Sequence, residues 1–223
     1  MDIVQNLNNI QLSLPDTVSL VAVSKTKPFS MIMDLLEAGH YDFGENKVQD
    51  LVSKAEELPD TIKWHYIGHL QSNKVKYIAP FVYLIHGVDS LKLLKVIEKE
   101  GEKVSRTINC LLQVHIADED SKFGLSESEL QELLSSEEYA SMQHVRINGI
   151  MGMATYTDNL EQVRQEFKNL KRIFEDTKKE YFENEDHFRD VSMGMSGDYQ
   201  IAIEEGSTMI RVGSLIFGPR NYL

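Results

Sequence analysis

The sequence predicts a single TIM-type (β/α)8 barrel, in which parallel strands alternate with helices. Two observations predict this α/β fold. First, eight short runs rich in β-branched and aromatic residues alternate with segments of helical periodicity along the 223 residues. Second, several of these runs are almost continuously apolar, which is typical of parallel strands covered on both faces. No linker, repeat or low-complexity tract interrupts the alternation, so we expect residues 1–223 to form one domain.

The predicted strands are short, and small or polar residues follow most of them. They cover residues 18–24, 41–43, 62–67, 81–86, 107–114, 145–151, 189–193 and 209–212. An open, doubly wound sheet is the alternative arrangement. It would usually have fewer strands in a chain of this length, and no Gly-x-Gly-x-x-Gly fingerprint follows the first strand. The barrel is therefore favoured.

Amphipathic spacing and terminal signals identify the helices. Pro28 lies near the start of one helix and Gly39 just beyond its end, which is the usual asymmetry of helix termini. The segment that begins at Ser126 opens Ser-Glu-Ser-Glu, a capping-box pattern. The predicted helices cover 28–38, 46–57, 90–100, 126–134, 159–181 and 198–205, with one further helix at 2–12 before the barrel.

Composition and charge argue against several kinds of partner. The formal net charge of -12 disfavours sequence-independent nucleic-acid binding and attachment to anionic membranes, because both need a basic face. No run approaches the roughly 18 apolar residues that span a bilayer, and the N-terminus does not resemble a secretory signal. The only cysteine, Cys110, lies in an apolar run and is interpreted as a core residue. We expect a monomeric, cytoplasmic protein.

Lys25 is the first candidate for a functional role, because barrels bind ligands at the C-terminal ends of their strands. It directly follows the first predicted strand. Partial desolvation there would lower the pKa of its ammonium group and free the amine to attack an aldehyde. A surface lysine that merely closes a strand is the alternative. Lys27 could share the same face, but Pro28 indicates that the chain is already turning, so Lys25 is the better nucleophile.

Polar residues after the second and third strands allow more than one interpretation. Asn46 could donate a hydrogen bond to a ring substituent of a ligand, or it could cap the next helix. His65 and His69 are four residues apart, but a predicted strand end separates them and no third ligand has a suitable spacing. A hydrogen-bonding role is therefore favoured over a metal site for these histidines.

The loops after the last two strands suggest a phosphate site. Ser196 and Gly197 follow the seventh strand, and Gly213 and Ser214 follow the eighth. Small residues let backbone N–H groups approach an anion closely, and phosphate sites in barrels form at these two loops. Arg211, at the end of the eighth strand, is expected to face the same mouth. A lysine, an arginine and a phosphate site together fit a phosphorylated aldehyde cofactor.

Several segments resemble a known family, the pyridoxal 5′-phosphate (PLP)-binding homeostasis proteins, which are related to the N-terminal barrel of alanine racemase. They occur in the family's order from the first strand to the C-terminus, and the third is the most specific. The region before Val18 is short for the family, and Tyr199 stands where methionine is common. The matching segments are AVSKTKP (22–28), FGEN (43–46), WHYIGHLQSNK (64–74), GIMGMA (149–154), MSGD (195–198), GSTMIRVGS (206–214) and IFGPR (216–220).

The resemblance implies a role for each candidate residue. PLP would form an internal aldimine with Lys25, and Asn46 would lie beside its ring. Met151 would pack near the ring, and Arg211 would address the pyridine nitrogen. The residues implied around the phosphate are Ser196, Gly197, Gly213 and Ser214.

The implied arginine bears on whether the protein is an enzyme. A guanidinium does not accept a proton, so it favours an unprotonated pyridine nitrogen, which is a weaker electron sink. Racemisation also needs acid-base groups on both faces of the substrate Cα, and Lys25 can serve only one. Tyr156 and His115 are the candidate substitutes for the other. Alanine racemase takes its tyrosine base from a second, β-rich domain, which we expect to be missing because the chain ends at Leu223.

The preferred hypothesis is therefore a non-catalytic PLP-binding protein in intracellular PLP (vitamin B6) and amino-acid homeostasis. Apo forms of PLP-dependent enzymes are candidate acceptors of the cofactor. A small PLP-dependent amino-acid racemase is the main alternative. A lysine-dependent aldolase acting on a phosphosugar, without a cofactor, is the third class.

Overall fold

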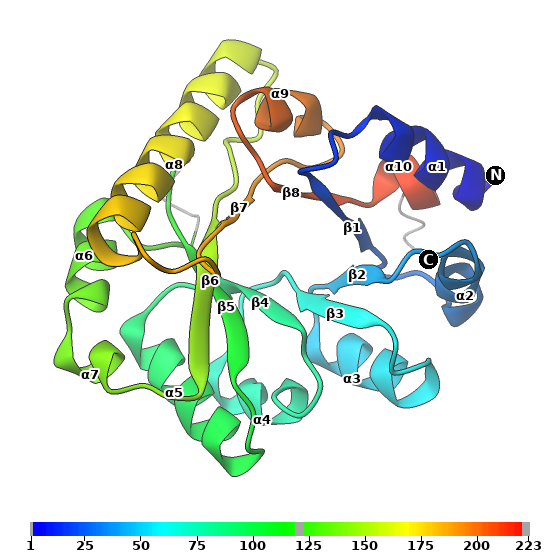
Figure 1. Cartoon of the computed structure of the whole chain (residues 1–223). Helices are drawn as coiled ribbons and strands as arrows, with labels where there is room; N and C mark the ends of the chain where they lie inside the picture. Colours follow the sequence, from blue (N-terminus) through cyan, green and yellow to red (C-terminus); the bar gives the residue numbers. More distant parts are fainter. Residues whose placement is uncertain (1, 119–122, 220–223) are drawn as a thin grey trace.

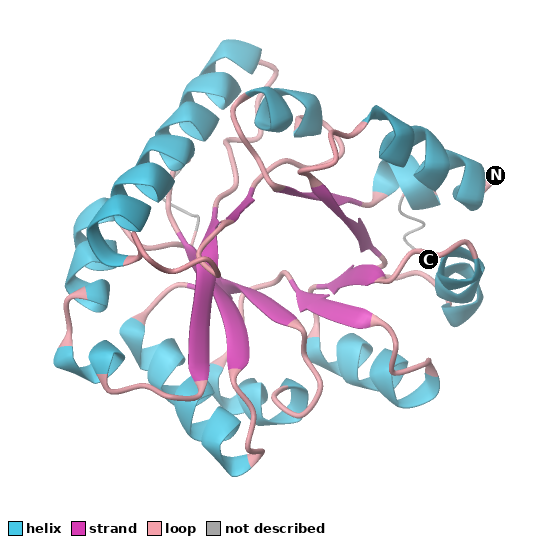
Figure 2. Cartoon of the chain, in the orientation of Figure 1, coloured by secondary structure: helices cyan, strands magenta, loops and turns pink. Residues whose placement is uncertain are grey.

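The computed structural model describes residues 2–118 and 123–219, which contain a closed barrel of eight parallel strands (Figures 1 and 2). The strands follow one another in sequence order around the barrel, and the last pairs with the first. The predicted fold class is confirmed. The strands are β1 (Ser19–Val23), β2 (Asp42–Glu45), β3 (Lys63–Tyr66), β4 (Leu84–Val88), β5 (Ile108–Gln113), β6 (Val145–Met151), β7 (Asp190–Ser192) and β8 (Met209–Val212).

Helices surround the barrel and cover the outer faces of its strands (Figure 2). The predicted helix before the barrel is present as α1, and Asp2 caps it by accepting a hydrogen bond from the backbone N–H of Gln5 at 2.9 Å. The helices are α1 (Ile3–Ser13), α2 (Phe29–Glu37), α3 (Val48–Glu57), η1 (Ser72–Lys74), α4 (Val75–Ile78), α5 (Leu91–Lys103), α6 (Glu127–Leu134), α7 (Glu137–Ala140), α8 (Leu160–Tyr181), α9 (Tyr199–Glu204) and α10 (Ser214–Phe217).

The predicted capping box at the start of α6 is confirmed. The Ser126 hydroxyl accepts a hydrogen bond from the Glu129 N–H at 3.2 Å, and the Glu129 carboxylate accepts one from the Ser126 N–H at 2.8 Å. The reciprocal pair satisfies N–H groups that a helix start otherwise leaves without partners.

Boundaries differ from the prediction where packing overrides local signals. Helix α5 does not end at Gly101 but continues to Lys103. A Cβ on Gly101 would lie 2.9 Å from the Arg106 carbonyl oxygen, so this glycine permits close approach of the chain rather than ending the helix. Four elements of three or four residues were not predicted, because they are too short to show a periodic pattern. These are η1, α4, α7 and α10.

The interior of the barrel holds two kinds of side chain. Val21, Leu84, Leu111, Met151 and Met209 form a separate apolar cluster. Polar side chains from β2, β3, β4, β7 and β8 form hydrogen bonds with one another. The larger apolar core lies between the strands and the helices. The barrel is therefore a packed core rather than a pore.

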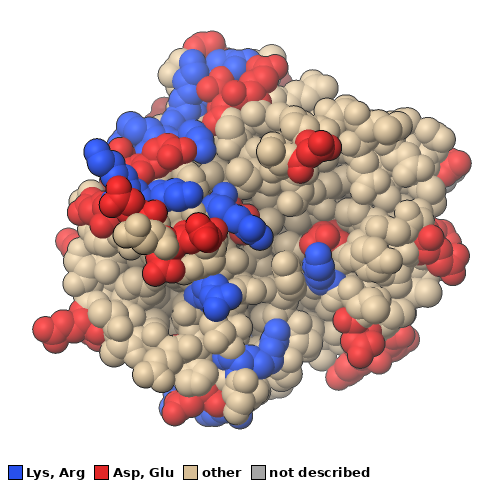
Figure 3. Space-filling view, viewed as in Figure 1, with Lys and Arg blue, Asp and Glu red and all other residues tan. Residues whose placement is uncertain are grey.

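Charged side chains of both signs gather over α8 on the face seen in Figure 3. Arg164 on this helix forms ion pairs with Glu204 and Glu205, and Arg172 pairs with Glu127 at 2.7 Å. Exposed pairs of this kind contribute little stability, because solvent and salt screen their charges. Within residues 2–118 and 123–219, no helix is both long and apolar enough to cross a membrane.

Candidate functional site

Barrel closure brings the end of β1 next to the end of β8. Val21 pairs with Arg211 and Ala22 with Val212 across this junction. The backbone of Gly213 comes so close to β1 that a Cβ there would lie 3.2 Å from the Val23 carbonyl oxygen. Lys25, half-buried and two residues beyond the end of β1, therefore follows the strand that pairs with β8, the strand of Arg211.

Lys27 has a structural role rather than a place beside Lys25. Its Nζ donates hydrogen bonds to the carbonyl oxygens of Phe217 at 3.1 Å and Pro219 at 3.3 Å, which ties the loop to the C-terminal segment. Thr26 between the two lysines has a φ of 63°, in the left-handed region that non-glycine residues rarely adopt. The chain therefore turns sharply directly after Lys25, as Pro28 had suggested.

A buried ion pair anchors the strand end from which Lys25 projects. Lys54 on α3 donates to the Glu45 carboxylate at 2.6 Å and to the Ser24 carbonyl oxygen at 2.9 Å. The Ser24 hydroxyl donates to the same Glu45 oxygen at 2.7 Å. Burial raises the pKa of Glu45, although the charge of Lys54 opposes this rise. Both the side chain and the carbonyl group of the residue before Lys25 are thus held in place, which the sequence reasoning did not foresee.

Asn46 does not cap the following helix. The N-cap of α3 is Lys47, and its side chain makes no capping hydrogen bond. The capping interpretation of Asn46 is wrong, because the extended backbone continues one residue further than expected before the helix begins. The backbone carbonyl of Asn46 accepts a hydrogen bond from the Tyr66 hydroxyl at 3.3 Å, and the Asn46 side chain is half-buried at the C-terminal end of β2.

The loops after β7 and β8 meet at the same end of the barrel. The Gly213 N–H donates a hydrogen bond to the Ser196 hydroxyl at 3.3 Å, which joins the two predicted phosphate loops directly. A Cβ built on Gly197 would have no atom within 4 Å, so the loop borders open space there. Ser214 is exposed and begins α10. The structure therefore brings these four residues together.

Arg211 on β8 is buried, with 4% of its surface exposed, and its side chain reaches the C-terminal ends of β7 and β6. Its Nη1 donates to the Ser192 hydroxyl at 2.6 Å, and its Nη2 donates to the Gly152 carbonyl oxygen at 3.3 Å. Burial lowers the pKa of Arg211 to about 10, and the Asp198 carboxylate opposes this fall, so the guanidinium stays positive at neutral pH. Met151, at the end of β6, belongs to the apolar cluster with Val21 and Leu84.

His69 and Phe123 cover another part of this end of the barrel. Their rings stack with centroids 4.0 Å apart, and His69 Nδ1 lies 3.2 Å from a carboxylate oxygen of Asp89. His65 instead points into the barrel, where it contacts His86 and Asp42. The two histidines that are close in sequence therefore have separate hydrogen-bonding environments. Neither His86 nor Ser192 was singled out from the sequence, because a single polar residue in a short strand gives no signal of its partner.

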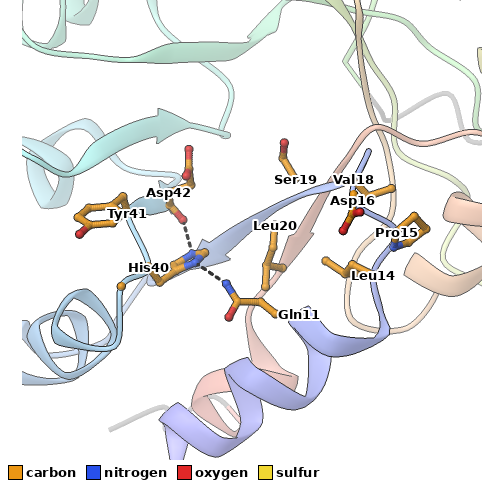
Figure 4. Close-up of a pocket in the computed structure, with 11 residues that line it drawn as sticks. Gln11, Leu14, Pro15, Asp16, Val18, Ser19, Leu20, His40, Tyr41 and Asp42 are labelled. Atoms are coloured by element: carbon orange, nitrogen blue, oxygen red, sulfur yellow. Dashed lines mark hydrogen bonds between the residues drawn. The ribbon is translucent and has the colours of Figure 1, made fainter.

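A cavity of about 350 Å³ lies at the opposite end of the barrel (Figure 4). It is lined by the starts of β1 and β2 and by the end of α1. His40 lies between Gln11 and Asp42, with 3.4 Å to the Gln11 amide nitrogen and 2.9 Å to the Asp42 carbonyl oxygen. None of the residues predicted to bind a cofactor lines this cavity.

Comparison with known proteins gives the class of barrel first. Residues 2–221 match the family model described as alanine racemase, N-terminal domain. An alanine racemase structure from Clostridium difficile 630 shares the fold, with a TM-score of 0.75 over 98% of this chain and 57% of that chain, at 12% identity.

Relatives with higher identity define the family more narrowly. Proteins named pyridoxal phosphate homeostasis protein include one from Aquifex aeolicus, 38% identical over 205 residues, which cover 91% of this chain and 87% of that protein. One from Escherichia coli is 37% identical over 216 residues, covering 93% and 88%. The structure of PipY from Synechococcus elongatus with PLP bound is 31% identical, with a TM-score of 0.88 over 97% of this chain and 100% of that chain. The chain belongs to the family of pyridoxal phosphate homeostasis proteins.

Proposed function

We propose that this protein binds PLP covalently through Lys25 and serves in intracellular PLP and amino-acid homeostasis without catalytic turnover. One observation carries the proposal. The loops after β7 and β8 are hydrogen-bonded to each other through Ser196 and Gly213, and β8, which carries the buried Arg211, pairs with the strand that Lys25 follows. The names of the relatives and the PLP-bound structure of PipY support the same cofactor.

The residues at this mouth fit the three functional groups of PLP. The half-buried amine of Lys25 suits the aldehyde, and the backbone N–H groups near Gly197 and Gly213 suit the phosphate. The guanidinium of Arg211 suits a pyridine nitrogen that accepts a hydrogen bond. We further propose that Asn46 lies beside the ring. Ser196, Ser214 and Met151 complete the proposed binding site.

Holding the cofactor is favoured over turning over substrates by the character of Arg211. When bound, PLP supplies an electron-withdrawing ring, and this property weakens when the pyridine nitrogen stays unprotonated. Arg211 remains a cation at neutral pH and can only donate to that nitrogen. Tyr156, a candidate for the second base of a racemase, exposes 98% of its surface.

The proposed setting is a monomer in the cytoplasm, with residues 1–223 acting as one cofactor-binding domain. The net charge of -12 suits a protein that does not associate with nucleic acid or anionic lipid. Burial of Cys110 raises the pKa of its thiol, which fits a core residue in a reducing compartment. Apo PLP-dependent enzymes are the proposed acceptors of the bound PLP.

Borohydride reduction followed by peptide mapping tests the attachment. The purified protein incubated with PLP should absorb visible light, and reduction should fix one pyridoxyl group on Lys25. Lys25→Ala should abolish the label, whereas the matched variant Lys27→Ala should keep it. A label on Lys27, or none, would refute the proposed attachment.

Chiral chromatography tests the absence of turnover. PLP-loaded protein incubated with common L-amino acids should produce no D-isomer above a protein-free control that contains PLP. A turnover that disappears in Lys25→Ala would establish the racemase alternative. Its further loss in Tyr156→Phe or His115→Ala would then identify the second base.

A further inference from the structure

A continuous row of hydrogen bonds crosses the barrel interior from Arg211 to Asp42, and we call these five side chains the interior relay. Arg211 Nη1 lies 2.6 Å from Ser192 Oγ. Ser192 Oγ lies 3.0 Å from His86 Nδ1, and His86 Nε2 lies 3.0 Å from His65 Nδ1. His65 Nε2 lies 3.1 Å from Asp42 Oδ1. The relay thus links the proposed cofactor mouth to the cavity at the other end of the barrel, which Asp42 helps to line.

With one proton on each ring, the Asp42 carboxylate sets the direction of the whole relay. A carboxylate can only accept, so His65 carries its proton on Nε2 and accepts a hydrogen bond at Nδ1. His86 then donates from Nε2 to His65 and accepts at Nδ1 from the Ser192 hydroxyl. The Ser192 oxygen accepts from Arg211, because a guanidinium can only donate. All four hydrogen bonds then point the same way.

The charges are consistent with this assignment. Burial lowers the pKa of His86 well below its ordinary value, and charge interactions with His65 and Arg211 lower it further, so His86 stays neutral. Burial opposes ionisation of Asp42, but hydrogen bonding and charge interaction with His65 outweigh it and lower the pKa of Asp42. A cation and a carboxylate therefore terminate the relay, and His86 between them is neutral.

The relay constrains the orientation of the guanidinium plane. Ser192 holds Nη1 and the Gly152 carbonyl holds Nη2, so rotation of the group about its long axis breaks at least one hydrogen bond. With its hydrogen directed to His86, the Ser192 hydroxyl presents a lone pair to Nη1 of Arg211. Buried polar networks of this kind are costly unless every group is paired. No side-chain atom of the relay is among the buried polar atoms without a partner in the described part of the chain.

We propose that Ser192 and His86 are positioning residues, which fix the Arg211 guanidinium in the orientation that meets the pyridine nitrogen of PLP. His65 and Asp42 set the direction of the hydrogen bonds that makes this possible. The inference rests on the proposed function, because it assumes that PLP is the ligand of Arg211. It adds four side chains that lie outside the proposed binding site and act on the cofactor only through Arg211.

The first experiment uses the protein without cofactor and needs no binding. Nitrogen-15 NMR at pH 7 should find the proton of His86 on Nε2 and a proton on the Nε2 of His65 that faces Asp42. Ser192→Ala should shift the His86 Nδ1 and Arg211 side-chain signals. Ile32→Val, in the core between the strands and the helices, should leave those signals unchanged. A proton on Nδ1 of either histidine, or Arg211 signals insensitive to Ser192→Ala, would overturn the relay.

The second experiment measures the effect on PLP. Ser192→Ala and His86→Leu should each weaken PLP binding by about tenfold or more, the loss expected when one charge-assisted hydrogen bond is misdirected. Both should also shift the visible absorption maximum of the bound cofactor, whereas Ile32→Val should not. Ser192→Thr, which keeps the hydroxyl, should restore both properties. A purely structural role for Ser192 would instead lower stability and leave the absorption maximum where it is.

The two experiments separate failure of this inference from failure of the proposed function. If wild-type protein binds PLP on Lys25 but Ser192→Ala matches it in affinity and spectrum, the positioning role is refuted and the proposed function stands. If wild-type protein binds no PLP, the proposed function is refuted, and the positioning role toward the cofactor falls with it.

Discussion

Removing the charge of Lys54 tests how much the buried ion pair near Lys25 contributes to stability. Glu45 is fully buried, and one of its oxygens, Oε2, has no hydrogen-bond partner among the described residues. In Lys54→Met the other oxygen keeps only the Ser24 hydroxyl. Breaking a buried pair by removing one partner costs about 3–5 kcal/mol, a large share of the roughly 5–15 kcal/mol that stabilises a typical domain.

Urea denaturation gives a direct measurement, because the chain contains one tryptophan, Trp64, and it is buried on β3. We expect Lys54→Met to lower the free energy of unfolding by about 3–5 kcal/mol at pH 8. The loss should shrink as pH falls, because burial already raises the pKa of Glu45 and loss of the Lys54 charge raises it further, so the carboxyl takes up a proton. The exposed Lys99→Met is the matched control and should change stability by less than about 0.5 kcal/mol.

A double variant separates charge from packing. Glu45→Leu combined with Lys54→Met removes the unpaired carboxylate, so it should recover a large part of the stability lost in the single variant. If Lys54→Met costs less than about 1 kcal/mol at pH 8, or the double variant is no more stable than the single one, the pair does not anchor the strand end as argued.

Three further predictions concern other parts of the barrel. Burial raises the pKa of Asp190 to about 6, so the folded state binds this proton more tightly than the unfolded state and stability falls as pH rises from about 4 to 6. In Asp190→Asn this fall should be absent. Between pH 4 and pH 8, the free energy of unfolding of the variant should therefore rise by up to roughly 3 kcal/mol relative to that of the wild type, measured by urea denaturation. Gly149→Ala should abolish soluble expression, because φ at Gly149 is 156° and a Cβ there would lie 1.8 Å from the Asp190 carbonyl oxygen. Gly39→Ala is the control: φ is 87° but no atom lies within 4 Å of the new Cβ, so thermal denaturation should show a loss of only about 1 kcal/mol. Pyridoxal without its phosphate should bind at least about 100-fold more weakly than PLP in an absorption titration, and equal affinities would refute a phosphate site at Ser196 and Gly213.

The fold could be predicted from the sequence because its signals are local. Strands β6 and β8 have the predicted bounds, since long apolar runs with clear turn residues define them. The position of the proposed binding site could be predicted because the C-terminal ends of all the parallel strands lie at one end of a barrel. Lys25, Arg211 and the loops at Ser196 and Gly213 needed only that rule.

The features that escaped prediction depend on how separate elements dock. The pair of Lys54 and Glu45 forms only when α3 packs on β2, and the sequence shows merely a lysine on an otherwise apolar helix face. The contact of His65 with His86 depends on the register of β3 with β4, in which His65 pairs with Leu84. Period-two patterning indicates which residues share a face of one strand, but not which side chains meet across a closed barrel.

The seam between β1 and β8 has a consequence for how the protein matures. Lys25 comes from the beginning of the chain, whereas Arg211 and Gly213 come from its last strand and loop. During synthesis the lysine emerges from the ribosome long before the residues proposed to hold the rest of the cofactor exist, so a nascent chain can offer PLP only a lone amine. Tight binding must wait until the final strand docks. PLP would then act as a ligand of the native state alone, stabilising finished molecules in proportion to its free concentration and leaving unfinished ones exposed to quality control.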